Sequence, residues 1–512
     1  MLATADKPTA DRKADFKLGI IAYRQGDYDI ALEKWIPLAN DGAVEAQVNL
    51  GIMYAKGQGV DRDSGAAFKW YRMAADKGHA KAEYNIGVMF ENGESVEQSY
   101  DEAARWYGRA VDHGNPQAHS ALGTLHEHGR GMEKNINQAM LWYVKATEKG
   151  CLQGQYSLAR LLENGIGEKR DYVRAAQLYA EAAKKKHPPS CYRLGLLYEL
   201  GKGVDQDFTA ARHLFNTAAD KGYTAAYHSM GLLYLEGRGV PLEDTKAQMW
   251  FQKATDAQHG DSQCIMGQLY ETGRILTKDP QKAMRWYRLA AAQNHPGGNY
   301  ALGLMYENGV GMASDYEEAA GFYRKGAESS HGPSCFRLGL MYRSGRGVDN
   351  DEPRAMELFS EAAKADYPEA LDLLGLIYLH GKAGIAADIR RGHDYLFNAA
   401  EQGYPPSCCN LGQIYLKGTG VEQDIPLAID WFRKGADQGY ADAQYYLSMM
   451  YIEAKAVERD LVEAYMWLDL AVKQDHRGAL KTRGSISKQL SPSEINEAET
   501  RALSWRPTAT SG

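Results

Sequence analysis

The sequence is poor in cysteine and has no long apolar segment. Its 512 residues include 6 cysteines, which we expect to be free thiols that act as small core residues. No run of 18 or more apolar residues occurs, so we expect no transmembrane helix. The first 14 residues, MLATADKPTADRKA, are polar and lack the apolar core of a signal peptide. We therefore expect a cytoplasmic protein, or a periplasmic or exported one if a leader has been removed.

The chain also has only a small excess of charge. The chain has 59 Lys and Arg residues against 66 Asp and Glu residues, which gives a net charge of −7 at pH 7. No basic run with interleaved aromatic residues occurs. Because binding to phosphates needs a basic face, we expect no nucleic acid as the main partner.

Motifs of catalytic and metal sites are missing as well. The chain has no nucleophile elbow and no H-E-x-x-H motif. Its G-x-G runs, such as Gly57–Gly59, follow helical patterns and lack a Lys-Ser/Thr partner, so we expect helix caps and not phosphate loops. The close pair His126 and His128 has no evident third ligand, and the other histidines are spread along predicted turns. We therefore expect no enzyme activity, no cofactor and no bound metal.

What the chain does contain is a period of 36 residues. A small residue, nearly always glycine, returns at this interval, and we call it the anchor. The anchors are Gly51, Gly87, Gly123, Ala159, Gly195, Gly231, Gly267, Gly303, Gly339 and Gly375, followed after one inserted residue by Gly412, Ser448 and Gly484. Such a period is typical of repeat arrays, in which each unit buries its apolar face against its neighbours. No segment alternates at period two, so the pattern predicts an all-α fold.

The repeat at residues 46–82 shows how the pattern predicts two helices. Leu50 and Met53 belong to one helical stripe, and Gly57 is the kind of residue that follows a helix C-terminus. Asp63 stands where a second helix should begin, because an aspartate there accepts hydrogen bonds from the free N–H groups of the first turn. A second apolar stripe follows. In most repeats it carries a bulky residue, often tryptophan, which we expect in the core.

The consensus A-x-x-x-L-G-x-x-Y-x-x-G-x-G-V-x-x-D-x-x-x-A-x-x-W-Y-x-x-A-A-x-x-G resembles the Sel-one-like repeat (SLR), a relative of the tetratricopeptide repeat. The resemblance covers residues 43–477 as twelve tandem 36-residue units. It implies a right-handed superhelical α-solenoid of antiparallel helix pairs. Residues 15–42 are similar to a tetratricopeptide unit, and residues 478–512 to C-terminal capping helices with a tail. Residues 1–14 are expected to be disordered or to be what remains after removal of a signal.

The same resemblance implies that the first helix of each unit lines a concave groove. Three positions of this helix are then expected to face a partner: three residues before the anchor, one after it and four after it. The candidates are Tyr84, Glu91, Glu127, Tyr156, Arg160, Glu163, Tyr192, Glu199, Glu271, Tyr300, Glu307 and Phe336. They predict an acidic ladder beside an aromatic strip.

Two alternatives to the groove remain open on the sequence alone. The tyrosines three before the anchor can pack between units, and the glutamates can form a solvated face that favours helix formation. If a partner binds in the groove, replacing Glu127, Glu163 and Glu199 with lysine should weaken partner binding and leave the helical content unchanged.

The family resemblance further implies an adaptor or scaffold in protein complexes. We expect a non-enzymatic protein that binds a protein or peptide with basic and apolar side chains along the groove. Two other functions stay open, a binder of cell-wall fragments or β-lactams and a structural subunit of an envelope assembly. The sequence does not identify the partner.

Overall fold

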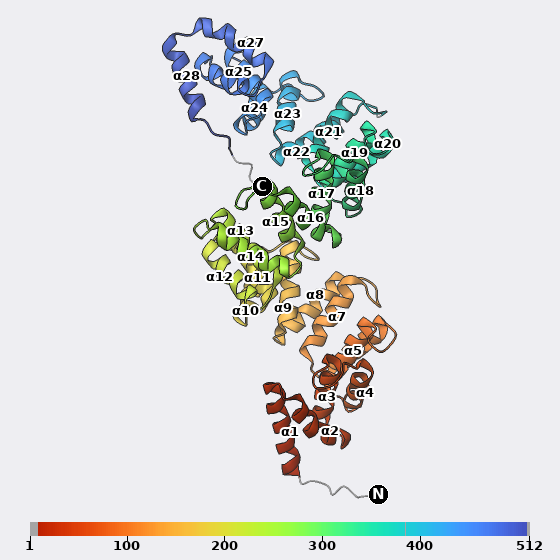
Figure 1. Cartoon of the computed structure of the whole chain (residues 1–512). Coiled ribbons are helices and arrows are strands. Elements are labelled where there is room, and N and C mark those ends of the chain that lie inside the picture. The colour runs from red at the N-terminus through yellow and green to blue at the C-terminus, as the bar shows by residue number, and fades with distance from the viewer. Residues whose placement is uncertain (1–8, 385, 509–512) are drawn as a thin grey trace. The chain divides into compact units, whose positions relative to one another are not determined.

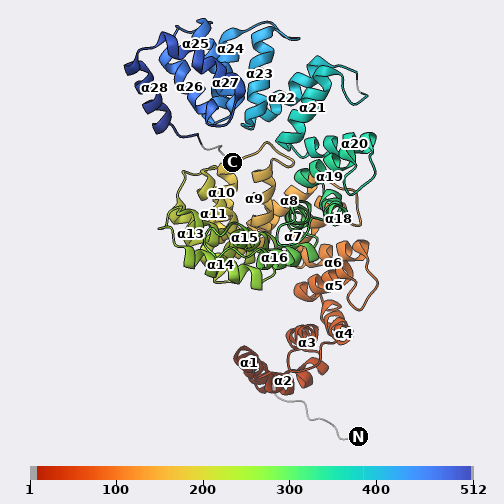
Figure 2. The ribbon, with the colours of Figure 1, turned by 45° about the horizontal axis from the view of Figure 1, so that its top comes forward.

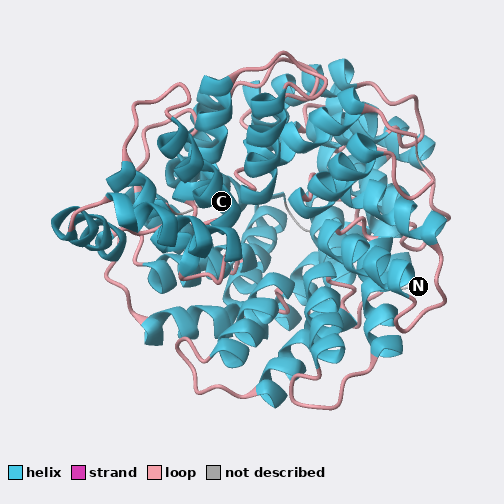
Figure 3. Ribbon diagram, turned by 90° about the horizontal axis from the view of Figure 1, so that it is seen from above, coloured by secondary structure: helices cyan, strands magenta, loops and turns pink. Residues whose placement is uncertain are grey.

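The computed structural model describes residues 9–384 and 386–508. This part of the chain forms 28 α-helices and one short 3₁₀ helix, and it contains no strand (Figure 3). None of the described helices combines the length and the apolar character needed to cross a bilayer. The all-α prediction is therefore confirmed.

Twelve consecutive helix pairs form the repeats, each with a first and a second helix (Figure 1). The first helices are α3 (Val44–Lys56), α5 (Ala80–Asn92), α7 (Pro116–His128), α9 (Leu152–Asn164), α11 (Pro188–Leu200), α13 (Thr224–Glu236), α15 (Gly260–Thr272), α17 (Pro296–Asn308), α19 (Gly332–Ser344), α21 (Pro368–His380), α23 (Pro405–Lys417) and α25 (Ala441–Glu453). The second helices are α4 (Ser64–Ala75), α6 (Tyr100–Asp112), α8 (Ile136–Glu148), α10 (Tyr172–Lys184), α12 (Phe208–Ala219), α14 (Asp244–Asp256), α16 (Pro280–Ala292), α18 (Tyr316–Glu328), α20 (Glu352–Lys364), α22 (Ile389–Glu401), α24 (Ile425–Asp437) and α26 (Leu461–Val472).

Further helices flank the repeats at both ends. The helices α1 (Thr9–Gln25) and α2 (Tyr28–Asn40) pack together before the first repeat. After the last repeat, α27 (Arg477–Ile486), the 3₁₀ helix Ser487–Gln489 and α28 (Pro492–Ser504) follow, and α27 and α28 both pack on α26. The leader predicted for residues 1–14 falls mostly outside the described residues, and residues 9–14 belong to α1.

The described helices fall into two compact units, one ending at Ala254 and the other beginning at Thr255. Within each unit, a helix packs most extensively on its partner in the same repeat and next on the helix of the following repeat. Figure 2 shows this for α3–α4 and α5–α6, which follow one another as neighbouring hairpins. Packing of this nearest-neighbour kind is what a 36-residue sequence period predicts.

Capping residues set the helix boundaries as the sequence predicts. In α7, the Asn115 side chain accepts from the Ala118 N–H at 3.0 Å, and Gly129 ends the helix at φ +67°. That left-handed conformation is open to glycine at little cost. In α12, the Asp207 carboxylate accepts from the Ala210 N–H at 3.0 Å. These caps satisfy N–H groups that have no partner within the helix.

The anchor glycines are required by contact between the two helices of a repeat. A Cβ atom added to Gly303 would lie 2.4 Å from the Tyr323 ring on the second helix. The residue 20 positions after the anchor is aromatic in most repeats, and the contact recurs wherever glycine is the anchor before such a residue. The exception is Ala159, which stands 20 residues before Tyr179. In the last repeat Ser448 replaces glycine, and the facing residue is the smaller Leu468. Small anchors thus let an aromatic ring lie against the backbone of the first helix.

Replacing Gly303 with alanine should lower the free energy of unfolding by about 1–3 kcal/mol, because the added methyl group overpacks the contact with Tyr323. The matched control is Gly321→Ala on α18, where an added Cβ meets no atom within 4 Å. That change should raise stability by about 0.5–1 kcal/mol through helix propensity alone. Urea unfolding followed by circular dichroism measures both. Equal effects of the two changes would contradict the packing role of the anchor.

Candidate partner-binding face on the first helices

The twelve candidate residues lie on first helices of seven repeats, and none of them is fully exposed. The glutamates Glu127, Glu163 and Glu199 are only 7%, 9% and 8% exposed. The expectation that these three stand free in solvent is wrong. The other nine candidates are half-buried.

A tyrosine of the second helix binds the glutamate of the same repeat. The Tyr179 hydroxyl donates to Glu163 Oε2 at 2.8 Å. The same bond joins Tyr107 to Glu91, Tyr143 to Glu127, Tyr287 to Glu271 and Tyr323 to Glu307, at 2.6–2.8 Å. The glutamate therefore ties the two helices of its repeat together.

An arginine from the following repeat pairs with the same carboxylate. Arg193 on α11 donates to both oxygens of Glu163, from Nη2 at 2.6 Å and from Nε at 3.1 Å. Equivalent pairs join Arg160 to Glu127 at 2.5 Å and Arg238 to Glu199 at 2.7 Å, and longer ones join Arg130 to Glu91 at 3.5 Å and Arg337 to Glu307 at 3.6 Å. These pairs connect neighbouring repeats and cancel much of the negative charge of the ladder.

Ionisation of the buried glutamates depends on these partners. Burial alone would raise the pKa of Glu127, but hydrogen bonds from Arg160 and Tyr143 outweigh it and lower the pKa. Its contribution to stability is therefore present above the pKa of the unfolded chain and is lost as pH falls through the lowered folded pKa. Glu199 has no tyrosine opposite, because Phe215 takes that place. At Glu199, burial outweighs the attraction of the Arg238 cation and raises the pKa of the carboxyl group.

The aromatic residues three before the anchor form a half-buried strip. The Tyr192 ring centroid lies 5.7 Å from that of Phe215 in its own repeat and 5.2 Å from that of Tyr223, which precedes the next first helix. Tyr84, Tyr156, Tyr300 and Phe336 contact the second-helix ring of their own repeat in the same way, at 5.6–6.0 Å. Toward the next first helix, Tyr156, Tyr300 and Phe336 also contact the residue that precedes it, which is His187, His331 and Tyr367 in turn. These rings therefore pack between helix pairs, as the alternative interpretation held, and each side chain is only half-buried.

A small cavity opens on the same face farther along the chain. It has a volume of about 180 Å³ and lies between α21 and α23. Leu376 and Leu379, one and four residues after their anchor, line it together with Ile414, His380 and Lys417. In this region leucines replace the glutamates of the earlier repeats, and the lining combines these apolar side chains with the polar Asn410, Gln413 and Thr419.

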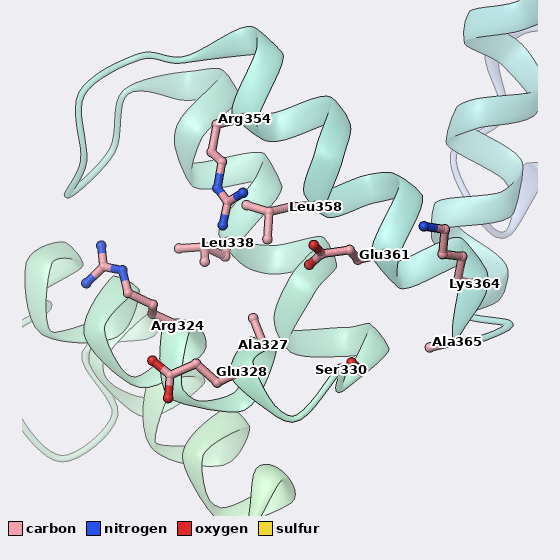
Figure 4. Close-up of a pocket in the computed structure, with 10 residues that line it drawn as sticks. All are labelled: Arg324, Ala327, Glu328, Ser330, Leu338, Arg354, Leu358, Glu361, Lys364 and Ala365. Carbon is pink, nitrogen blue, oxygen red and sulfur yellow. The ribbon is translucent and has the colours of Figure 1, made fainter.

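A second, larger cavity lies between the second helices α18 and α20 (Figure 4). Its volume is about 630 Å³. Ala327, Leu338 and Leu358 form an apolar floor, and Arg354 and Glu361 reach toward it from α20. Its rim carries charges of both signs, with no arrangement that selects one ligand. Among the described residues no group of three possible metal ligands occurs.

The sequence-based prediction considered only the first helices, so it did not include the tyrosines and arginines that bind the glutamates. One signal for them is present in the sequence: glutamate four after the anchor coincides with tyrosine 20 after it in five repeats. Where phenylalanine or leucine takes the later position, the earlier one is usually not acidic, as with Arg343 and Phe359. There the guanidinium carbon lies 4.6 Å from the ring centroid. The paired variation marks a side-chain contact and not a free acidic face.

Tandem hairpins that bury their surfaces against their neighbours, and that present the same first-helix positions in turn, define an α-solenoid repeat protein. The Sel1 repeat model matches twelve consecutive segments: 44–79, 80–115, 116–151, 152–187, 188–223, 224–259, 260–295, 296–331, 332–367, 368–404, 405–440 and 441–476. The chain belongs to the Sel1 repeat family. Proteins of this family are generally scaffolds for protein interactions.

The chain is also similar to solved structures. The chain is similar to c5321 of uropathogenic Escherichia coli, described as a protective antigen that displays an SLR fold, with 29% identity and a TM-score of 0.53. That match covers 93% of this chain and 94% of the other. A Sel1 repeat protein from Oxalobacter formigenes is 32% identical, with a TM-score of 0.44, over 47% of this chain and 98% of its own. No curated protein matches the sequence.

Proposed function

We propose that the protein is a non-enzymatic adaptor that binds a protein or peptide partner along the face formed by its first helices. The observation that supports this most is the repetition of half-buried aromatic rings at one position of neighbouring first helices, at Tyr156 and Tyr192 in one unit and at Tyr300 and Phe336 in the other. Aromatic side chains with a partly open edge are the usual anchors of a protein interface. An extended or helical segment bound on either unit would meet two such anchors in neighbouring repeats.

The charges on this face favour a partner with apolar and basic side chains. Glu91, Glu271 and Glu307 are half-buried and keep access to solvent. Because the Arg130–Glu91 and Arg337–Glu307 pairs are long, at 3.5 and 3.6 Å, these carboxylates can also attract a basic side chain of a partner and raise the rate of association. Glu127, Glu163 and Glu199 are buried in pairs with arginines, so they rigidify the face. The hollow beside Leu376 would receive an apolar side chain. Tyr84 extends the aromatic positions toward the N-terminus, and Arg160 holds Glu127 in place beside Tyr156.

Photo-cross-linking distinguishes this face from the opposite one. We would place p-benzoylphenylalanine at Tyr192, at Leu376 and, as the control, at Val173 on the second helix α10, whose side chain is 55% exposed. We expect the first two positions to cross-link one protein in the native source and Val173 to give no such product. Cross-linking from Val173 alone would refute the proposal.

With the cross-linked partner purified, Tyr192→Ala should weaken binding at least tenfold, because the change removes an aromatic anchor. Val173→Ala should change the dissociation constant less than about twofold. Isothermal titration calorimetry measures the affinity, and a thermal melt of each variant reports the fold. Unchanged affinity of a folded Tyr192→Ala variant would remove the strip from the interface.

A further inference from the structure

One cysteine differs from the others in its surroundings. All six cysteines lie in the described part of the chain, and five of them are buried, whereas Cys264 on α15 is partly exposed. The prediction that cysteines act as core fillers is confirmed for the five and is wrong for Cys264. This residue stands three before its anchor, the position that tyrosine takes in several other repeats. Its thiol therefore belongs to the partly open strip of the first helices.

A histidine and an aspartate complete a chain of contacts with this thiol. The Cys264 Sγ atom lies 3.4 Å from Nδ1 of His295, which caps the next first helix, α17. His295 Nε2 lies 3.0 Å from an oxygen of Asp261. Because the carboxylate accepts the proton at Nε2, Nδ1 is the acceptor of the ring. It faces the sulfur and also accepts the capping hydrogen bond from the Gly298 N–H at 3.3 Å. The order Cys–His–Asp is that of an activated nucleophile, a base and a group that orients the base.

Two further features distinguish this place. The hydrogen bond to Asp261 and the contact with Cys264 raise the pKa of His295 to about 10, which makes its imidazole a stronger base than that of a free histidine. The sulfur also lies against the first turn of α17, where a Cβ atom on Gly297 would be 3.6 Å from it. An imidazole and a helix N-terminus are the usual surroundings of reactive cysteines.

Other repeats contain parts of this arrangement and serve as internal comparisons. His476 and Asp442 form the same pair at 3.0 Å in the last repeat, with Tyr445 in place of the cysteine. Cys409 occupies the same position before its anchor, but Tyr440 replaces the histidine. Cys409 is 2% exposed, and burial raises its pKa to about 12. In the described repeats, thiol, imidazole and carboxylate meet at Cys264 alone.

We propose that Cys264 is a nucleophilic modification site that forms mixed disulfides with small-molecule disulfides. His295 Nδ1 takes the proton from Sγ, and the thiolate attacks one sulfur of the incoming disulfide. The bond between the two incoming sulfurs breaks as the bond to Sγ forms. The second sulfur leaves as a thiolate and takes up a proton from His295 or water. The modification would place a new group on the strip of the first helices, whether or not a protein partner binds there.

The full-length protein can be tested with 5,5′-dithiobis(2-nitrobenzoic acid), a small disulfide that releases a coloured thiolate. We expect one thiol per chain to react rapidly, at least as fast as free glutathione at the same pH. Cys264→Ser should abolish this phase, and Cys409→Ser should leave it unchanged. Mass spectrometry after treatment with oxidised glutathione should find the adduct on Cys264.

Two variants test the role of the histidine and the aspartate. His295→Asn keeps a side chain that can cap α17 but removes the base, and we expect it to slow the rapid phase at least tenfold. Asp261→Asn changes a side chain that is 63% exposed, so the fold should persist while the rate falls severalfold. A rapid phase that survives Cys264→Ser would overturn the proposal. So would rates for Asp261→Asn and folded His295→Asn equal to that of the unaltered protein.

Discussion

Replacing Trp106 with alanine should lower the free energy of unfolding by about 3–5 kcal/mol, because it creates a cavity in the core. Trp106 on α6 is 5% exposed. Its ring belongs to a cluster with buried residues of α3, α4 and α5, among them Val48, Ala75 and Met89. The change therefore removes packing both within a repeat and between neighbours. It also removes a cation–π contact, in which the guanidinium carbon of Arg109 lies 4.4 Å from the centroid of the tryptophan ring.

Urea unfolding followed by circular dichroism measures this loss, and hydrogen exchange locates it. We expect faster exchange in α4, α5 and α6 than in repeats farther along the chain, because each repeat contacts only its neighbours. Leu141→Ala on α8 is the control, since that side chain is 55% exposed. It should change stability by less than about 0.5 kcal/mol. A loss below about 1 kcal/mol for Trp106→Ala would contradict the core role of the tryptophan.

Replacing Glu163 with alanine should cost about 3 kcal/mol, because it leaves buried partners without their acceptor. The Glu163 carboxylate accepts from Tyr179 and from two nitrogens of Arg193. Removing it leaves a tyrosine hydroxyl and a guanidinium facing an empty site. By the same reasoning, lysine at Glu163 would place two cations together in a buried position. From the structure we therefore expect this charge reversal to destabilise the fold, whereas the sequence alone suggested that helical content would be unchanged.

The matched control is Glu168→Ala, which breaks an exposed pair with Arg174 at 3.5 Å. Pairs of this kind contribute little, so the loss should stay below about 0.5 kcal/mol. The double variant Glu163→Ala with Arg193→Ala should be more stable than the single change, because no unpaired charge remains. Denaturant unfolding of the unaltered protein, the two single variants and the double variant gives the free energies of unfolding to compare. Equal losses for Glu163→Ala and Glu168→Ala would show that the buried network does not stabilise the array.

The fold could be predicted from the sequence because its determinants are local and recur. Gly129 ends a helix and Asp207 begins one through contacts within a few residues. The regular return of such signals every 36 residues fixes the helix pairs. The contact that requires glycine at the anchor could not be predicted in the same way. The Tyr323 ring that requires Gly303 lies 20 residues away, on the other helix of the repeat.

The candidate site was predicted less well, because its contacts cross between helices and between repeats. The spacing of Glu163 along α9 indicates which side of that helix it occupies. It does not show that Tyr179 and Arg193 approach from two other helices. The same limit applies to Cys264, whose partner His295 lies 31 residues away. Side chains that look free on one helix can be enclosed once the repeats stack.

The most direct test of the proposed binding face is hydrogen–deuterium exchange of the full-length protein, with and without the partner found by cross-linking. If the partner binds along the first helices, exchange should slow in α5, α9, α11, α17 and α19. The second helices α6, α10, α12, α18 and α20 should change little. Protection confined to the second helices, or to α27 and α28, would show that the partner uses a different surface.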